Sequence, residues 1–173
     1  MAEIHLMRER ERVAALRRQL PQGAAMMFGK KQTRPCPMCT LWIDGWNGVA
    51  HHLRQNMDVV IVAATDPAAL RAHARKRGWD NLRLLSCGAS TFKYDLGSED
   101  REGKQDSTVS VFTRDADGTL RHFYTAHPSM AKDIKERGID LLSPVYHILD
   151  LTPHGRGNWY ASFNYAASLW NTR

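Results

Sequence analysis

The chain has 173 residues, which fits a single domain, and its hydrophobic content of 43% supports one core and excludes a disordered protein. The formal net charge of +6 does not by itself indicate a nucleic-acid partner, because the basic residues are dispersed and no nucleic-acid-binding motif accompanies them. No apolar run approaches the roughly 20 residues that span a bilayer, and residues 1–20 have no apolar signal-peptide centre, so we expect no membrane association and a cytoplasmic location.

The first expected element is an amphipathic helix over residues 3–19, which Pro21 and Gly23 would end. Its apolar residues fall near one face: Ile4, Met7, Val13, Leu16 and Leu20. We therefore divide the chain into a helical N-terminal extension (1–23), one α/β domain (24–151) and an irregular C-terminal tail (152–173).

The next segment contains the dithiol. A short strand is expected over Ala24–Phe28, followed by a polar loop to Pro35 and a helix from the cysteines to about Gln55. Pro37 suits the first helical position, where its missing N–H has no cost. The predicted buried stripe of this helix is Trp42, Trp46, Val49 and Leu53, with Cys39 on the same side.

A crossover unit is predicted next. Residues 58–65 form a nearly continuous apolar run, typical of a central strand covered on both faces. Asp66 as N-cap, Pro67 in the first turn and Gly78 as the stop predict a helix over 67–77. A strand at about 82–86 completes a strand-helix-strand unit with parallel pairing.

The last part of the domain is expected to contain a hairpin. Residues 97–106 read as a charged, exposed loop, and 107–113 and 119–125 as strands joined through 115–118. Further helices are expected over 128–137 and from Ser143 to about Leu151. This order of elements predicts an α/β thioredoxin-like fold, with a central mixed sheet flanked by helices.

The pair Cys36 and Cys39 carries the chemical argument. A helix N-terminus stabilises a thiolate, and Cys36 is expected there, with Cys39 one turn further in and on the packed side. Cys36 would attack a disulfide or a peroxide, Cys39 would close the disulfide, and an external thiol would reduce it. This chemistry requires neither a cofactor nor a metal.

Other interpretations of the cysteines stay open. Two cysteines three apart also form half of a zinc site, but the candidate further ligands do not repeat that spacing: Cys87, His51, His52, His73, His122 and His127. The pair could also be inert, or serve a non-enzymatic module that binds zinc or a protein partner. Cys87 is expected to be a partly buried small residue.

The remaining residues receive structural or open interpretations. Trp42 and Trp46 are expected in the core, and Asp44 on a solvated helix face. A tail loop with His154, Arg156 and Trp159 could cover the dithiol, bind an anion, dock onto another subunit or remain mobile. Homodimerisation through the first helix or through 141–151 is a further alternative.

From Met26 to Trp159 the sequence resembles a bacterial thioredoxin-like family of unknown function whose members are predicted dithiol-disulfide oxidoreductases. The matching stretches are MFG (27–29), PCPMCTLWIDG (35–45), RGW (77–79), STFKYDLGSED (90–100), STVSVFTRDADGTLRHFY (107–124) and DLTPHGR (150–156). The resemblance implies a thioredoxin fold and a redox role for Cys36 and Cys39, and it supplies no substrate.

Two departures accompany this resemblance. Family members usually have a longer stretch before Met-Phe-Gly, whereas here only residues 22–26 follow Leu20-Pro21, which would leave 24–28 as a short central strand. Thioredoxins place a cis-proline before the strand that corresponds to Thr108–Phe112, whereas Asp106 and Ser107 stand there in this chain. Peroxiredoxins also lack that proline, so substrate docking is expected to differ from that of thioredoxin.

Overall fold

A five-stranded mixed sheet forms the centre of the computed structural model, which describes residues 21–128, 142–157 and 159–165. Its strands are β1 (Pro21–Gly29), β2 (Asp58–Ala64), β3 (Arg83–Ser86), β4 (Thr108–Arg114) and β5 (Leu120–Ala126). They lie in the order β3-β2-β1-β4-β5. The three strands β1 to β3 are parallel, and β4 pairs antiparallel with both β1 and β5.

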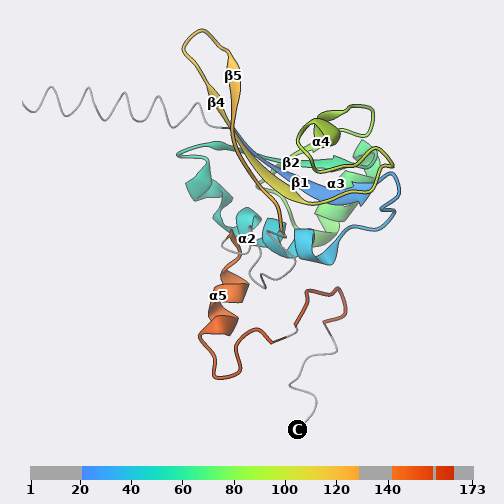
Figure 1. Cartoon of the computed structure of the whole chain (residues 1–173). Helices are drawn as coiled ribbons and strands as arrows, with labels where there is room; N and C mark the ends of the chain where they lie inside the picture. Colours follow the sequence, from blue (N-terminus) through green and yellow to red (C-terminus); the bar gives the residue numbers. More distant parts are fainter. Residues whose placement is uncertain (1–20, 129–141, 158, 166–173) are drawn as a thin grey trace, which may run out of the picture.

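Helices cover both faces of this sheet (Figure 1). The helices α2 (Pro37–Leu53) and α3 (Pro67–Arg77) lie on one face, and the short α4 (Phe92–Asp95) lies on the other. The helix α5 (Pro144–Asp150) follows beyond α2. The expected mixed sheet flanked by helices is therefore confirmed.

The strand β2 shows why the central strands read as continuous apolar runs. Val59, Ile61 and Ala63 enter the main core, which α2 and α3 cover. Val62 and Ala64 point to the opposite face, where a smaller cluster contains Cys87 and Phe92. Since alternate residues of a strand face opposite sides, both sets must be apolar when both faces are covered.

Local capping signals fix the bounds of α3. The Asp66 carboxylate accepts hydrogen bonds from the backbone N–H groups of Ala68 and Ala69, each at 2.9 Å. Gly78 ends the helix in the left-handed conformation, with φ of 67°. The observed bounds, Pro67–Arg77, are those expected from the sequence.

Several expectations need correction. Val49 is 46% exposed and does not belong to the buried stripe of α2, to which Ile43 and Ala50 contribute instead. The segment 97–106 is not uniformly exposed, because Ser98 and Gln105 are buried.

The larger differences from the expected elements concern β1 and α4. The strand β1 begins at Pro21 rather than at Ala24, and it is the central strand of the sheet. The helix α4 was not expected. The helices expected at 3–19 and 128–137 lie outside the described residues. The first of them is also one of the two segments named for homodimerisation, so that part of the homodimer alternative lies outside the described residues as well.

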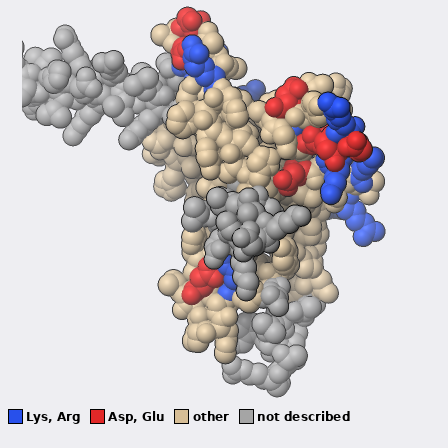
Figure 2. Space-filling view, in the orientation of Figure 1, with Lys and Arg blue, Asp and Glu red and all other residues tan. Residues whose placement is uncertain are grey.

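Charged side chains are mixed on the visible face of the molecule. Figure 2 shows Lys and Arg gathered together with Asp and Glu at one end, while much of the remaining face carries neither. Within the described part of the chain, the helices are too short or too polar to cross a membrane.

Candidate active site

Cys36 is the N-cap residue of α2. Its backbone is extended, with φ of −70° and ψ of 125°, and Pro37 follows in the first turn. The Cys36 N–H donates to the Met27 carbonyl at 3.1 Å, which attaches the loop to the end of β1. The Cys39 N–H points at the Cys36 sulfur at 3.4 Å. A sulfur in this place receives an otherwise unpaired helix N–H and the positive end of the helix dipole, which together stabilise a thiolate.

Cys39 lies one turn further along α2 and is 2% exposed. Its sulfur accepts a hydrogen bond from the Met27 N–H at 3.5 Å. The hydrogen bond with Cys36, burial and the charge of Cys36 raise the pKa of the Cys39 thiol well above its usual value, while the Met27 amide and the Ser107 hydroxyl oppose this shift. Cys36 is thus half-buried, whereas Cys39 is buried and its raised pKa favours the thiol form.

Ser107 lies directly before β4, at the position where thioredoxins have a cis-proline. The peptide bonds of the described residues are all trans. The side chain at this place is therefore a hydroxyl, and its hydrogen bond lowers the pKa of the Cys39 thiol.

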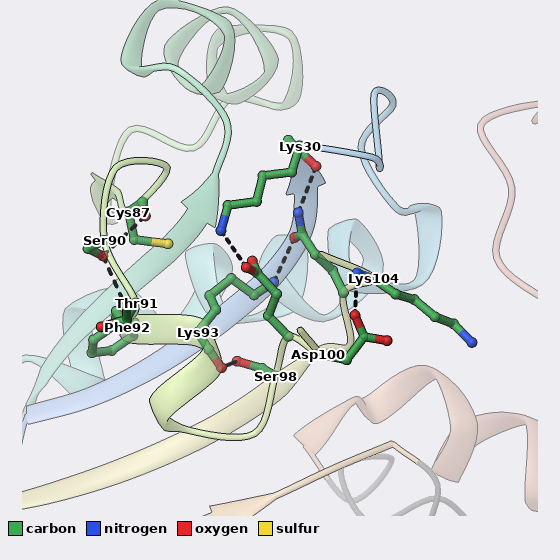
Figure 3. A network of polar contacts seen from close by, with 12 residues as sticks. Lys30, Cys87, Ser90, Thr91, Phe92, Lys93, Ser98, Asp100 and Lys104 are labelled. Atoms are coloured by element: carbon green, nitrogen blue, oxygen red, sulfur yellow. Dashed lines mark hydrogen bonds and ion pairs between the residues drawn. The ribbon is translucent and has the colours of Figure 1, made fainter. Parts of the chain in front are cut away.

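A buried lysine, which the sequence interpretation did not identify, lies on the other side of β1. Lys93 on α4 is 1% exposed, and its ammonium donates to the Met26 carbonyl at 2.9 Å and to Gln105 Oε1 at 2.8 Å (Figure 3). Gln105 in turn donates to the Gly29 carbonyl at 2.6 Å. Burial lowers the pKa of Lys93, and the charges of Cys39 and Cys87 oppose that shift. The sequence signal was an isolated lysine in a short polar stretch, which gives no hint of burial.

The first turn of α2 is also connected to α3. The Thr40 hydroxyl donates to the Cys36 carbonyl at 2.9 Å and lies 3.2 Å from His73 Nε2. Because the hydroxyl proton is used on the carbonyl, His73 Nε2–H must be the donor to Thr40. Burial and the charge of Arg77 lower the pKa of His73, which favours its neutral form.

The sequence suggested that Asp44 lies on a solvated helix face, but its carboxylate is bonded to other side chains. Its carboxylate accepts hydrogen bonds from Trp79 Nε1 at 2.8 Å and from both Nε (3.2 Å) and Nη2 of Arg77. Asp44 thereby connects α2 to the end of α3. Trp42 and Trp46 are buried in the core, as expected.

Two grooves flank the Cys36 segment. One, of about 520 Å³, is lined by residues that include Phe28, Pro35 and His73. The other, of about 300 Å³, lies between the start of α2 and the tail. Tail residues border both grooves: Phe163 packs edge-on against His73, and the Arg77 guanidinium donates to the Tyr165 hydroxyl at 2.7 Å.

Met38, between the two cysteines, connects them to the C-terminal region. Its side chain is buried, and its sulfur accepts hydrogen bonds from the Tyr146 hydroxyl at 3.3 Å and the Ala161 N–H at 3.2 Å. Arg156, a candidate anion ligand in the sequence, instead pairs with Asp150 at 2.6 Å and lies over the Tyr146 ring.

The candidate zinc ligands are not brought together in the described residues. Cys36 and Cys39 are adjacent, but no group of three or more His, Cys, Asp or Glu in the described ranges is arranged to hold a metal ion. Cys87 is buried behind the sheet, as expected for a small packed residue, and burial raises its pKa. His51 and His52 lie in the last turn of α2.

Comparisons with known proteins agree with this fold. A family model described as "Bacterial protein of unknown function (DUF899)" matches residues 24–171. A comparison with curated proteins gave no match.

Solved structures similar to the chain include three peroxiredoxin-type proteins. A peroxiredoxin Q mutant from Xanthomonas campestris matches with a TM-score of 0.50 and 12% identity, over 75% of this chain and 78% of that chain. Reduced Prx3 from Vibrio vulnificus, solved with H2O2, matches with a TM-score of 0.48 and 12% identity, over 75% and 81%. AhpC from Mycobacterium tuberculosis matches with a TM-score of 0.45 and 12% identity, over 70% of this chain and 66% of that chain. The peroxiredoxin Q match confirms that the fold is thioredoxin-like.

Proposed function

The chain belongs to the bacterial DUF899 family, whose function is unknown, and from the geometry of its own site we propose that it is a dithiol oxidoreductase acting on a disulfide or a peroxide. One observation carries the proposal: the Cys36 sulfur caps α2 and accepts the Cys39 N–H, while Cys39 lies buried one turn behind it. Cys36 is the attacking residue and Cys39 the resolving residue.

In the first step the Cys36 thiolate attacks the substrate. With a disulfide, one new S–S bond forms to Cys36 and the other substrate sulfur leaves as a thiolate. With a peroxide, the O–O bond breaks, Cys36 becomes a sulfenic acid, and the departing alkoxide or hydroxide takes up a proton to give an alcohol or water. The N–H of Cys39 and the helix dipole favour the anionic sulfur that both reactions need.

In the second step Cys39 closes the intramolecular disulfide. Its sulfur attacks the Cys36 sulfur, and the proton that Cys39 loses goes to the departing thiolate or to the hydroxide that leaves as water. Two electrons have then passed from the dithiol to the substrate. An external thiol reductant must return them before the next turnover.

The fold supports both substrate classes. Thioredoxin-like folds carry redox cysteines at the start of the helix that follows the first central strand, and Cys36 lies there, as the N-cap of the helix that follows β1. The similarity to peroxiredoxin Q adds a reason to include peroxides. The two grooves are lined by Pro35 and Pro37, the residues on either side of Cys36, and so lie next to the same cysteine.

The proposal is tested with three cysteine variants and two substrate types. Cys36→Ser should reduce turnover of both a model disulfide and hydrogen peroxide to the uncatalysed rate, because the attacking sulfur is lost. Cys39→Ser should accumulate a mixed disulfide or a sulfenic acid at Cys36, visible by mass spectrometry. Cys87→Ser is the matched control and should retain turnover, because its sulfur lies behind the sheet.

Three results would contradict the proposal. The first is a Cys36→Ser variant with unchanged turnover. The second is an oxidised wild-type protein in which Cys36 and Cys39 never pair. The third is a protein purified with one equivalent of zinc held by these cysteines. The zinc result would favour the binding-module alternative instead.

A further inference from the structure

Lys93 is a charged side chain in a place where charges are costly. It is 1% exposed, and moving an ammonium from water to such a site is unfavourable unless opposite charge or strong hydrogen bonds compensate. Its two acceptors, the Met26 carbonyl and the Gln105 amide oxygen, are both neutral. Figure 3 shows the Lys93 side chain running toward β1, the strand that carries the Met26 carbonyl.

The Met26 carbonyl and the Met27 N–H belong to the same peptide group. Lys93 donates to the oxygen of this peptide at 2.9 Å, and the nitrogen of the same peptide donates to the Cys39 sulfur at 3.5 Å. An ammonium on the oxygen draws electron density from the nitrogen and makes its N–H a stronger donor, because hydrogen bonds in a chain polarise one another. One rigid peptide thus connects the buried cation to the buried sulfur.

From this connection we infer that Lys93 is a positioning residue that favours the thiolate form of Cys39 through the Met26–Met27 peptide. The inference rests on the proposed function, in which Cys39 must lose its proton to attack the Cys36 sulfur. The hydrogen bond with Cys36 and burial both disfavour that loss. The Lys93 cation counteracts these two effects by favouring proton loss from Cys39 at the stage when Cys36 no longer carries negative charge.

The carboxylates near Lys93 are paired with other residues. Glu99 and Asp106 on the following loop and the thiols of Cys39 and Cys87 are the titratable groups that face it. Glu99 is ion-paired with Lys30, and Asp106 lies 3.2 Å from His127 Nδ1. Both carboxylates therefore have cationic or protonatable partners of their own. A Cys39 thiolate is the anion that the Lys93 charge can stabilise along the peptide.

The test measures ionisation of Cys39 directly. In a Cys36→Ser/Cys87→Ser background Cys39 is the remaining thiol, and the pH dependence of its alkylation reports its ionisation. Lys93→Gln keeps a donor for Met26 without the charge, and should slow alkylation at neutral pH on the order of tenfold and move the profile to higher pH. Lys93→Arg keeps the charge and should restore much of the rate.

Lys104→Gln is the matched control, since Lys104 is an exposed lysine on the neighbouring loop whose hydrogen bonds are made by its backbone and not by its ammonium. Its alkylation profile should be that of the parent. Folding of each variant is checked by circular dichroism. An unchanged profile in folded Lys93→Gln would overturn the inference, as would equal effects of Lys93→Gln and Lys93→Arg, because those outcomes describe a purely structural lysine.

A second measurement keeps Lys93 intact and does not depend on whether its variants fold. In the same single-thiol background, the NMR signals of the Met27 amide and of Lys93 Cε should titrate together with Cys39. If neither signal follows the thiol, the inference fails. Both experiments read the ionisation of Cys39 alone, so they are independent of whether Cys36 and Cys39 form a disulfide, which tests the proposed function.

Discussion

At the residue scale, Thr40 shows how closely the dithiol is connected to its surroundings. The side chain is 1% exposed and joins the Cys36 carbonyl to His73 Nε2. The ring of His73 also packs edge-on against Phe28 and Trp79. This histidine therefore lies one hydrogen-bonded residue away from the attacking cysteine, in an environment that disfavours its charge.

The lowered pKa of His73 predicts a pH dependence of stability. Burial and Arg77 lower the pKa of His73 in the folded state, so the unfolded chain takes up a proton at higher pH than the folded chain does. The stabilising contribution is then complete above the unfolded value of about 6.5, and it is lost as the pH falls through the folded value. Chemical unfolding measured between pH 8 and pH 5 should show a falling free energy of unfolding.

The variant His73→Gln should flatten that dependence, because the group that binds the extra proton on unfolding is gone. The control is His52→Gln, at an exposed histidine in the last turn of α2, which should leave the dependence as in the parent. If His73→Gln and the parent lose stability in parallel on acidification, another group is responsible.

At the element scale, Gly29 fixes the junction between β1 and the dithiol loop. Its φ is 103°, and a Cβ there would lie 2.2 Å from the Ala64 carbonyl carbon and the Thr65 nitrogen. Both atoms are backbone atoms at the end of β2 and cannot move aside. Gly78 also has a positive φ, of 67°, but no atom lies within 4 Å of the place where its Cβ would be.

These two glycines form a matched pair for mutation. Gly29→Ala should lower the free energy of unfolding by about 3 kcal/mol or more, since it combines backbone strain with a backbone clash. Gly78→Ala carries the strain alone and should cost about 1 kcal/mol. Urea unfolding of both variants measures the difference, and similar losses would show that the close approach of β1 to β2 at Gly29 is not a constraint.

The elements that sequence reasoning located are those with local signals. Asp66, Pro67 and Gly78 determine the ends of α3 through a side-chain cap, a first-turn proline and a left-handed glycine, and the hairpin turn at 115–118 closes through hydrogen bonds between Asp115, Gly118 and Thr119. Cys36 at the start of α2 belongs to the same class, because Pro37 marks the first turn.

The features that were missed depend on contacts between distant segments. Lys93 is bonded to Met26, 67 residues away, and Gln105 to Gly29, 76 residues away. The charged composition of 97–106 suggested exposure. The sequence does not reveal that Lys93 and Gln105 have hydrogen-bond partners on β1. Asp44 likewise finds its partners 33 and 35 residues further along the chain, at Arg77 and Trp79. Polarity in the sequence indicates a need for hydrogen bonds, and only the fold shows where they are made.

At the scale of the whole molecule, the site is assembled from the centre of the sheet and from the C-terminal end of the chain. The central strand β1 delivers the dithiol loop, and α4 reaches the opposite side of the same strand. The tail contacts α2 through Ala161 and α3 through Phe163 and Tyr165. Of the alternatives open for the tail, this placement favours cover beside the dithiol.

Placement of the tail beside Pro35 and Pro37 predicts that it restricts access to Cys36. A Phe163→Ala/Tyr165→Ala variant removes the contacts with His73 and Arg77 and opens both grooves. The rate constant for Cys36 alkylation should rise several-fold, while the free energy of unfolding changes little, since both side chains are more than 40% exposed. Phe123→Ala, on the exposed strand β5, is the aromatic control and should leave the rate constant unchanged. Equal rate constants in all three proteins would mean that reagents reach Cys36 from a side that the tail does not cover, and the grooves would then have no part in admitting substrate.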